Sequence, residues 1–148
     1  MSHVNLNYHL IFGTKNHKNL IDTHIRERLY EYIGSIIRDK DGNQMEIGGT
    51  GNHIHILASF HQTKNVAGMV RDIKSNSAGW LNETDEYPHQ FRWQTKYGAF
   101  SVSKSRVPAV AEYIQNQQEH HRAKTFREEF VEFLDRHEID YDDQYLWE

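Results

Sequence analysis

The sequence predicts an α+β fold of the ferredoxin-like (split βαβ) type, an antiparallel sheet with helices on one face and a further helical segment at the C-terminus. Two observations favour it. Short segments in which apolar and polar residues alternate are typical of strands, and longer segments with apolar residues three or four apart are typical of helices. These segments follow one another in the order β-α-β-β-α-β, which is the order of the split βαβ arrangement.

The first half of the chain contains a predicted strand, a helix and two further strands. Residues 4–12 alternate along a strand whose apolar face is formed by Val4, Leu6, Tyr8, Leu10 and Phe12. Residues 22–38 have helical spacing, with apolar positions at Ile25, Leu29, Ile33, Ile36 and Ile37. The turn signal Asp41-Gly42-Asn43 follows, and strands are expected at residues 44–49 and 52–60.

The second helix and the fourth strand follow in the middle of the chain. A helix is expected over about residues 64–82, because apolar side chains recur there at helical spacing, and Thr63 is the candidate for its N-cap. Residues 90–103 contain a short strand signal that is rich in aromatic residues. These two elements complete the six of the predicted fold.

Two more helices are expected before the chain ends. Ser105 is a candidate cap for a helix that has Pro108 in its first turn and runs to about residue 124. The sequence Thr125-Phe126-Arg127-Glu128 matches a capping box, which begins a helix that ends near Arg136. Residues 137–148 form an acidic tail, and no linker or repeat divides residues 1–148, so a single domain is expected.

Composition excludes several kinds of protein. The chain has no cysteine, which rules out disulfides, thiolate metal sites and cysteine nucleophiles. No apolar run approaches the roughly 18–20 residues that a membrane-spanning helix needs, so no membrane partner is expected. The first residues do not have the pattern of a signal peptide, and a cytoplasmic location is the expectation.

The net charge of −4 is unevenly distributed. Residues 125–148 hold nine acidic side chains against Arg127 and Arg136, a net charge of −7, so residues 1–124 carry +3. Phosphate contacts need basic side chains, and a mildly basic body is compatible with them. Charge therefore permits a nucleic-acid partner without predicting one.

His53 and His55 are candidate metal ligands. They lie two residues apart in a predicted strand, so their side chains leave the same face, with Cα atoms about 6.6 Å apart, and Ile54 between them is expected in the core. That separation lets both imidazoles converge on one ion. An isolated pair of this kind is more often part of a solvated strand face, and this alternative stays open on the spacing alone.

Tyr113 and Gln117 are the second candidate pair. They lie four residues apart in a predicted helix, so they share a face that His120 continues. Such a pair usually faces water, and Tyr113 also fits a half-buried aromatic residue. Together with the histidines, the pair supplies a third metal ligand and a nucleophile.

A His-hydrophobe-His strand followed by a helix with tyrosine and, four residues later, glutamine is similar to the HUH endonucleases. Within them the chain resembles the single-tyrosine transposases of the insertion-sequence 200/605 type (IS200-like transposases). The resemblance extends to residues 7–16, 93–102, 113–121 and 145–148, and so to essentially the whole chain. Lys96 stands where the family pattern has glycine, a departure that touches no candidate catalytic residue.

The resemblance implies a metal-dependent reaction on single-stranded DNA in a bacterial or archaeal cell. His53, His55 and Gln117 are expected to bind one divalent ion, Mg²⁺ or Mn²⁺, although two imidazoles and an amide by themselves favour manganese or zinc over magnesium. Tyr113, in the C-terminal catalytic helix, is expected to attack the scissile phosphate, leaving a free 3′-hydroxyl and a 5′-phosphotyrosine that is later rejoined.

The resemblance also implies partners. Relatives bind hairpins at the single-stranded ends of the mobile element, and they form homodimers whose composite active sites take the tyrosine helix from the other subunit. Candidate phosphate contacts are Lys64, Arg71, Lys74, Arg92, Lys96, Lys104, Arg106, Arg122 and Lys124. Candidate base-stacking residues are Trp80, Trp93, Tyr97 and Phe100, each of which also fits a core position.

Three other interpretations stay open. The same order of elements underlies RNA-binding modules that stack bases on exposed aromatic residues of the sheet. A metallohydrolase of small substrates would use Tyr113 as an acid or a binding group. A host-domesticated or catalytically inactive relative would bind single-stranded nucleic acid without cutting it.

Overall fold

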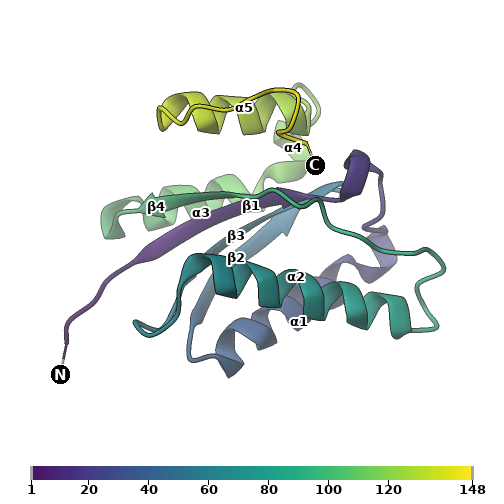
Figure 1. Ribbon diagram of the computed structural model, residues 1–148, viewed down its shortest axis with the longest axis horizontal. Helices are drawn as coiled ribbons and strands as arrows, with labels where there is room; N and C mark the ends of the chain where they lie inside the picture. Colours follow the sequence, from purple (N-terminus) through teal and green to yellow (C-terminus); the bar gives the residue numbers. More distant parts are fainter. Residues whose placement is uncertain (1, 148) are drawn as a thin grey trace.

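A computed structural model describes residues 2–147 of the chain (Figure 1). Its elements in order are β1 (Asn7–Gly13), η1 (Lys15–His17), α1 (Thr23–Asp39), β2 (Asn43–Gly49), β3 (His53–Ser59), α2 (Val66–Glu83), β4 (Gly98–Val102), η2 (Lys104–Arg106), α3 (Val107–Gln115), α4 (Gln117–His120) and α5 (Phe126–Arg136). No helix within these residues is long and apolar enough to cross a membrane.

The four strands form one antiparallel sheet in the order β2-β3-β1-β4, which confirms the predicted α+β, split βαβ arrangement. The two central strands, β1 and β3, are paired so that Ile11 lies opposite His55 and Gly13 lies opposite His53. The histidine pair therefore lies in the middle of the sheet, with a neighbouring strand on each side of β3.

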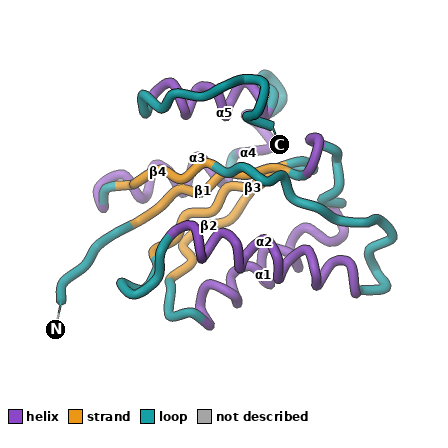
Figure 2. Tube along the Cα trace, viewed as in Figure 1, coloured by secondary structure: helices purple, strands orange, loops and turns teal. Residues whose placement is uncertain are grey.

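Helices cover both faces of the sheet (Figure 2). Helices α1 and α2 pack together on one face and enclose the main core, which includes Leu10, Phe12, Ile25, Ile33, Ile54, Ile56 and Ile73. On the other face, α3 lies against β2 and β3, and α5 lies above the sheet (Figure 1). The expected helices on one face are therefore α1 and α2, and the C-terminal helices form a third layer on the opposite face.

Two predicted boundaries are wrong. The first strand begins at Asn7, not at residue 4, because both neighbouring strands end opposite Asn7, and Val4 and Leu6 beyond it are about half exposed. The N-cap of α2 is Asn65, not Thr63, since the Asn65 side chain accepts a hydrogen bond from the Gly68 amide at 2.7 Å.

The helix predicted from Ser105 to about residue 124 is interrupted. Residues 104–106 form a 3-10 turn, and α3 then begins without a side-chain cap and with Pro108 in its first turn, as predicted. At Asn116 the backbone leaves the helical region, with φ −97° and ψ 21°, and α4 is a separate short helix. Asparagine is a weak helix former, which explains a break at this position.

The capping box predicted at Thr125 and Glu128 is confirmed, and α5 ends at Arg136 as expected. Helix α5 packs through Phe126, Phe130 and Leu134 onto Ile11 and Phe100 of the sheet. Leu146 of the tail joins this cluster, and Arg127 lies 4.5 Å above the Trp147 ring. The capping box and the aromatic cluster together hold the first turn of α5 close to β3.

Replacing Gly48 of β2 with alanine is expected to loosen α3 from the sheet. A Cβ at Gly48 would lie 2.4 Å from the Ile114 carbonyl oxygen, which is backbone and has no other rotamer to adopt. We expect a loss of about 1–3 kcal/mol in the free energy of unfolding, measured by urea denaturation.

Gly79→Ala is the matched control, because a Cβ there meets nothing within 4 Å. This change in the interior of α2 should stabilise the protein by roughly 0.5–1 kcal/mol. Equal stability of Gly48→Ala and the wild type would contradict the close packing of α3 on β2.

Candidate metal centre and tyrosine site

His53 and His55 project from β3 into the space between the sheet and the C-terminal helices. Both side chains are 0% exposed, so the alternative of a solvated strand face is wrong. Ile54 between them is buried in the core on the α1 and α2 side, as expected from strand alternation. The His53 ring stacks on Phe126 of α5 at a centroid distance of 4.3 Å.

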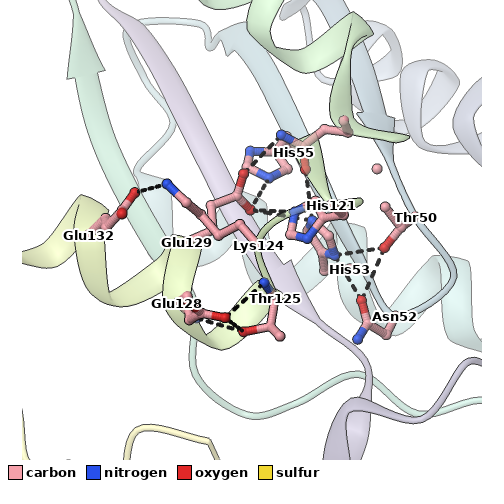
Figure 3. Close-up of polar contacts among 12 residues, drawn as sticks. Thr50, Asn52, His53, His55, His121, Lys124, Thr125, Glu128, Glu129 and Glu132 are labelled. Carbon is pink, nitrogen blue, oxygen red and sulfur yellow. Dashed lines mark hydrogen bonds and ion pairs between the residues drawn. The ribbon is translucent and has the colours of Figure 1, made fainter. Parts of the chain in front are cut away.

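The two ring nitrogens of His53 both face oxygen atoms. On one side, Nδ1 lies 2.8 Å from Asn52 Oδ1 and 3.0 Å from the Thr50 hydroxyl. On the other side, Nε2 lies 2.8 Å from Gln117 Oε1 (Figure 3 shows the Thr50 and Asn52 side). A neutral imidazole has one proton and can donate to only one of these sides. In the tautomer with its proton on Nδ1, the Nε2 lone pair faces Gln117 Oε1, an arrangement that a cation between them would stabilise.

Glu129 of α5 lies at the centre of the site, and the sequence analysis missed it. Its Oε1 lies 2.9 Å from His55 Nε2, 3.1 Å from His121 Nε2 and 3.4 Å from His53 Nε2 (Figure 3). Its Oε2 accepts a hydrogen bond from Gln117 Nε2 at 2.9 Å. The side chain is 1% exposed, and among residues 2–147 no lysine or arginine forms an ion pair with it.

Tyr113 of α3 reaches the same carboxylate. Its hydroxyl donates to Glu129 Oε2, and its ring is half-buried and stacks on His120 at 4.5 Å. Gln117, on the far side of the break at Asn116, is 1% exposed. The structure therefore brings the four predicted side chains, His53, His55, Tyr113 and Gln117, together within one chain.

The charges in this site are unbalanced. Burial lowers the pKa of His53 to about 4, so that ring is neutral near pH 7. Burial by itself raises the pKa of Glu129, but the hydrogen bonds from the surrounding histidines outweigh it and hold that pKa below its usual value. Burial and the nearby Glu129 carboxylate raise the pKa of Tyr113 well above its usual value. A buried carboxylate without a lysine or arginine partner among residues 2–147 favours a cation at this place.

The donor atoms fit a divalent ion. One nitrogen each of His53 and His55 and one carboxylate oxygen of Glu129 lie within 4.8 Å of one another, and Gln117 Oε1 adds a fourth donor beside His53. Two imidazoles with carboxylate and amide oxygens suit Mn²⁺ better than a pair of imidazoles and an amide would, because the carboxylate adds a hard, charged ligand.

His9 of β1 is a second residue that the sequence analysis did not single out. It is 2% exposed, and its Nε2 lies 2.8 Å from His55 Nδ1, on the side of the ring away from Glu129. Strand alternation contained a signal for it, since His9 leaves β1 on the face opposite to Leu10 and Phe12. Nothing comparable marked Glu129, whose neighbours in sequence form an ordinary capping box.

Most predicted DNA contacts lie on the surface, but not all are free to bind phosphate. The exposed ones are Lys64, Arg71, Arg92, Lys96, Lys104, Arg106 and Arg122. Lys124 forms an ion pair with Glu132, 2.5 Å away. Lys74 donates to the carbonyl oxygens of Gln94, Thr95 and Lys96, and burial lowers its pKa to about 8, so its role is to hold the 94–96 loop.

Arg71, Arg92 and Lys15 line a cavity of about 550 Å³ between α2 and the loop that precedes β4, with Tyr97 at its side. Of the four predicted stacking residues, only Tyr97 is exposed, at 37%. Trp93 and Phe100 are buried, and Trp80 stacks on Tyr32 at 4.8 Å. These three residues pack against other side chains of the protein, so they are not free to stack on bases.

The metal-free protein is expected to lose stability as the pH falls from 7 to 5. Because the pKa of His53 is about 4 in the folded protein and 6.5 ordinarily, the unfolded chain binds a proton in this window that the folded protein does not. The free energy of unfolding then falls with pH, by on the order of 1 kcal/mol. Urea denaturation in the presence of a chelator measures the profile.

His53→Gln should reduce the slope of that profile without abolishing it, because burial also lowers the pKa of His9 and of His17. The same change at His61, which is exposed, should leave the slope as in the wild type. An unchanged slope in His53→Gln would mean that His53 does not contribute to it.

Two solved structures share this fold. A candidate transposase from Deinococcus radiodurans R1 aligns with a TM-score of 0.58 and 19% identity, covering 79% of this chain and 95% of that one. A REP-associated tyrosine transposase, solved bound to a REP hairpin, aligns with a TM-score of 0.62 and 14% identity, covering 82% of this chain and 74% of that one. No curated protein matches the sequence significantly.

The sequence itself matches a family model. The model is described as "Transposase IS200 like", and it covers residues 2–117, which include β1, the histidine pair of β3, Tyr113 and Gln117. Helix α5 and Glu129 lie beyond the matched region. With more than half of its length matched, the chain belongs to the IS200-like transposase family.

Proposed function

We propose that this transposase cuts and rejoins single-stranded DNA by metal-assisted transesterification, with Tyr113 as the nucleophile. One observation supports this most directly: the Tyr113 hydroxyl and the side chains of His53, His55 and Gln117 all contact the same buried carboxylate. A nucleophile and a set of metal ligands within contact of one another are what phosphoryl transfer through a tyrosine requires.

In the cleavage step, the Tyr113 oxygen attacks the scissile phosphorus. A bond forms between that oxygen and the 5′-phosphate, and the bond from phosphorus to the 3′-oxygen breaks, so that a 3′-hydroxyl is released after it takes a proton from water. The phenol must lose its own proton, and Glu129 Oε2 is the acceptor that already contacts it. The ester stores the bond energy, and attack by a 3′-hydroxyl reverses the step.

His53, His55 and Gln117, with Glu129 as a further donor, would hold Mg²⁺ or Mn²⁺. A divalent ion held there would supply Lewis-acid chemistry, which polarises a phosphate and offsets its negative charge. The chain's own groups orient the ligands: Asn52 and Thr50 contact the outer nitrogen of His53, which directs the inner nitrogen to the centre of the site.

A cavity of about 290 Å³ leads to Tyr113 from the outside, between α3, α4 and α5. Lys124 and Arg136 line it beside Glu119 and Glu132. His53, His55, Gln117 and Glu129 are all at most 1% exposed, so the phosphate reaches the tyrosine from this side.

The DNA substrate is a single strand with hairpins at the element ends, in the cytoplasm of a bacterial or archaeal cell. The likeness to a structure bound to a REP hairpin supports a hairpin, and the exposed cations Arg71, Arg92 and Lys15 offer a place for its backbone. A homodimer follows the family expectation. The site needs no tyrosine helix from a second copy here, because Tyr113 reaches His55 of its own chain, at a ring distance of 5.8 Å.

The rival interpretations have less support. An RNA-binding sheet platform needs exposed aromatic residues on the central strands, whereas helices cover both faces of this sheet (Figure 2). A metallohydrolase of small substrates does not explain the family match. A domesticated or inactive relative with the same fold is the second candidate. A test for a covalent protein–DNA adduct distinguishes it from an active transposase.

Tyr113→Phe is expected to abolish a covalent protein–DNA adduct. Wild-type protein incubated with labelled single-stranded DNA from its own flanking sequence and Mn²⁺ should give an adduct that survives denaturing electrophoresis, because a phosphotyrosine ester links the two. Tyr141→Phe is the matched control, since that tyrosine lies in the tail and is 39% exposed. An adduct that persists in Tyr113→Phe would identify a different nucleophile, and DNA binding without any adduct would favour the inactive relative.

His55→Ala is expected to reduce adduct formation by at least about 100-fold at a fixed Mn²⁺ concentration, because it removes a ligand whose nitrogen faces the centre of the site. His61→Ala removes an exposed histidine of the same chain and should leave the rate unchanged. A chelator should stop the wild type, and added Mn²⁺ should restore it. Full activity of His55→Ala or of the chelated protein would exclude metal assistance.

A further inference from the structure

The face of the sheet that the C-terminal helices cover carries a third histidine beside His53 and His55. His9 lies on β1 opposite Leu57, and His55 lies on β3 opposite Ile11, so the two histidines are diagonal neighbours on one face of the central strand pair. Their rings are 5.0 Å apart, and His9 Nε2 lies 2.8 Å from His55 Nδ1. This contact lies on the far side of the His55 ring from Glu129, which faces Nε2.

The chemistry of imidazole determines the direction of this hydrogen bond when a metal is bound. An ion at His55 takes the lone pair of Nε2, and the single proton of the neutral ring must then be on Nδ1. That N–H points at His9 Nε2, which has to accept it. Without an acceptor at this place, the proton of His55 is favoured on Nε2, where it donates to Glu129 Oε1 and excludes the ion.

We infer that His9 is a positioning residue of the metal centre: its Nε2 accepts the Nδ1–H of His55 and thereby directs the Nε2 lone pair of His55 to the ion. The inference rests on the proposed function, because it requires that His55 is a ligand. His9 itself touches neither the DNA nor the ion.

The surroundings hold His9 in this orientation. Its ring lies edge-on to Phe133 at 5.1 Å and to Tyr113 and Phe100 at 6.4 Å, so aromatic residues from α5, α3 and β4 enclose it. A ring packed on three sides and 2% exposed keeps one rotamer without a water-filled alternative.

His53 has an acceptor of a different kind for the same purpose. Its Nδ1 faces Asn52 Oδ1 and the Thr50 hydroxyl, which belong to the turn between β2 and β3. The two ligands of one strand are thus oriented from two directions, His53 by its own turn and His55 by the neighbouring strand. Removing His9 should therefore affect one ligand of the two.

The test compares His9→Leu with His9→Gln. Leucine has no acceptor, whereas the glutamine amide oxygen occupies about the place of His Nε2 and accepts a hydrogen bond. Mn²⁺ affinity is measured by equilibrium titration with detection of free Mn²⁺ by electron paramagnetic resonance, and urea denaturation in chelator gives the metal-free stability of each variant. We expect His9→Leu to raise the Kd for Mn²⁺ about 10–100-fold and His9→Gln to recover most of the loss.

Ile73→Val is the packing control. It removes a buried methyl group from the core on the opposite face of the sheet and should lower the metal-free stability while leaving the Kd for Mn²⁺ within about twofold of the wild type. If His9→Leu loses stability but keeps wild-type affinity, His9 is a packing residue and the inference is wrong. If His9→Leu and His9→Gln lose affinity equally, hydrogen-bond acceptance is not its role.

The outcomes separate the inference from the proposed function. Wild-type protein that binds no Mn²⁺ would overturn both, since neither a metal centre nor its positioning would exist. Wild-type binding that is lost in His55→Ala but retained in His9→Leu would overturn only the inference. Binding that weakens in His9→Leu and returns in His9→Gln supports it.

Discussion

A buried carboxylate surrounded by histidine, glutamine and tyrosine side chains determines the organisation of this molecule. Glu129 contacts His53, His55, Gln117 and Tyr113, and it is withdrawn from water without a lysine or arginine partner among the described residues. Such a group is costly to bury unless it is paired with a positive charge. Side chains from β3, α3 and α4 meet Glu129 of α5 at this place, and a divalent ion would balance the charge of its carboxylate.

The fold holds these side chains through ordinary packing. Strand alternation sends Ile54 and Ile56 to the core below the sheet, and His53 and His55 to the opposite face. On that face, α3 lies so close to Gly48 that β2 has no room for a side chain there. Helix α5 is fixed by its capping box and by aromatic contacts to the sheet, and these place its first turn over the histidines.

Much of this could be predicted from local sequence, and most of the missed parts are contacts between residues far apart along the chain. The order of elements, the histidine pair and the tyrosine–glutamine pair follow from residue spacings of two and four. Glu129 and His9 act on His55 from 74 and 46 residues away along the chain, and no local period reports such contacts. Lys74 is a further example of a long-range contact. Its sequence position suggests a phosphate ligand, but its ammonium group donates to three backbone carbonyl oxygens some 20 residues further along the chain. The break at Asn116 has no sequence signal, because residues 115–122 contain neither the glycine nor the proline that commonly marks the end of a helix.

We expect His53, His55, Gln117 and Glu129 to surround a divalent cation. A crystal structure of the protein soaked in Mn²⁺, with anomalous diffraction collected at the manganese edge, would locate the ion. An anomalous peak is expected about 2.2 Å from both histidine Nε2 atoms and from an oxygen of Gln117 or Glu129. Manganese bound elsewhere, with the Glu129 carboxylate still in contact with both histidines, would contradict it.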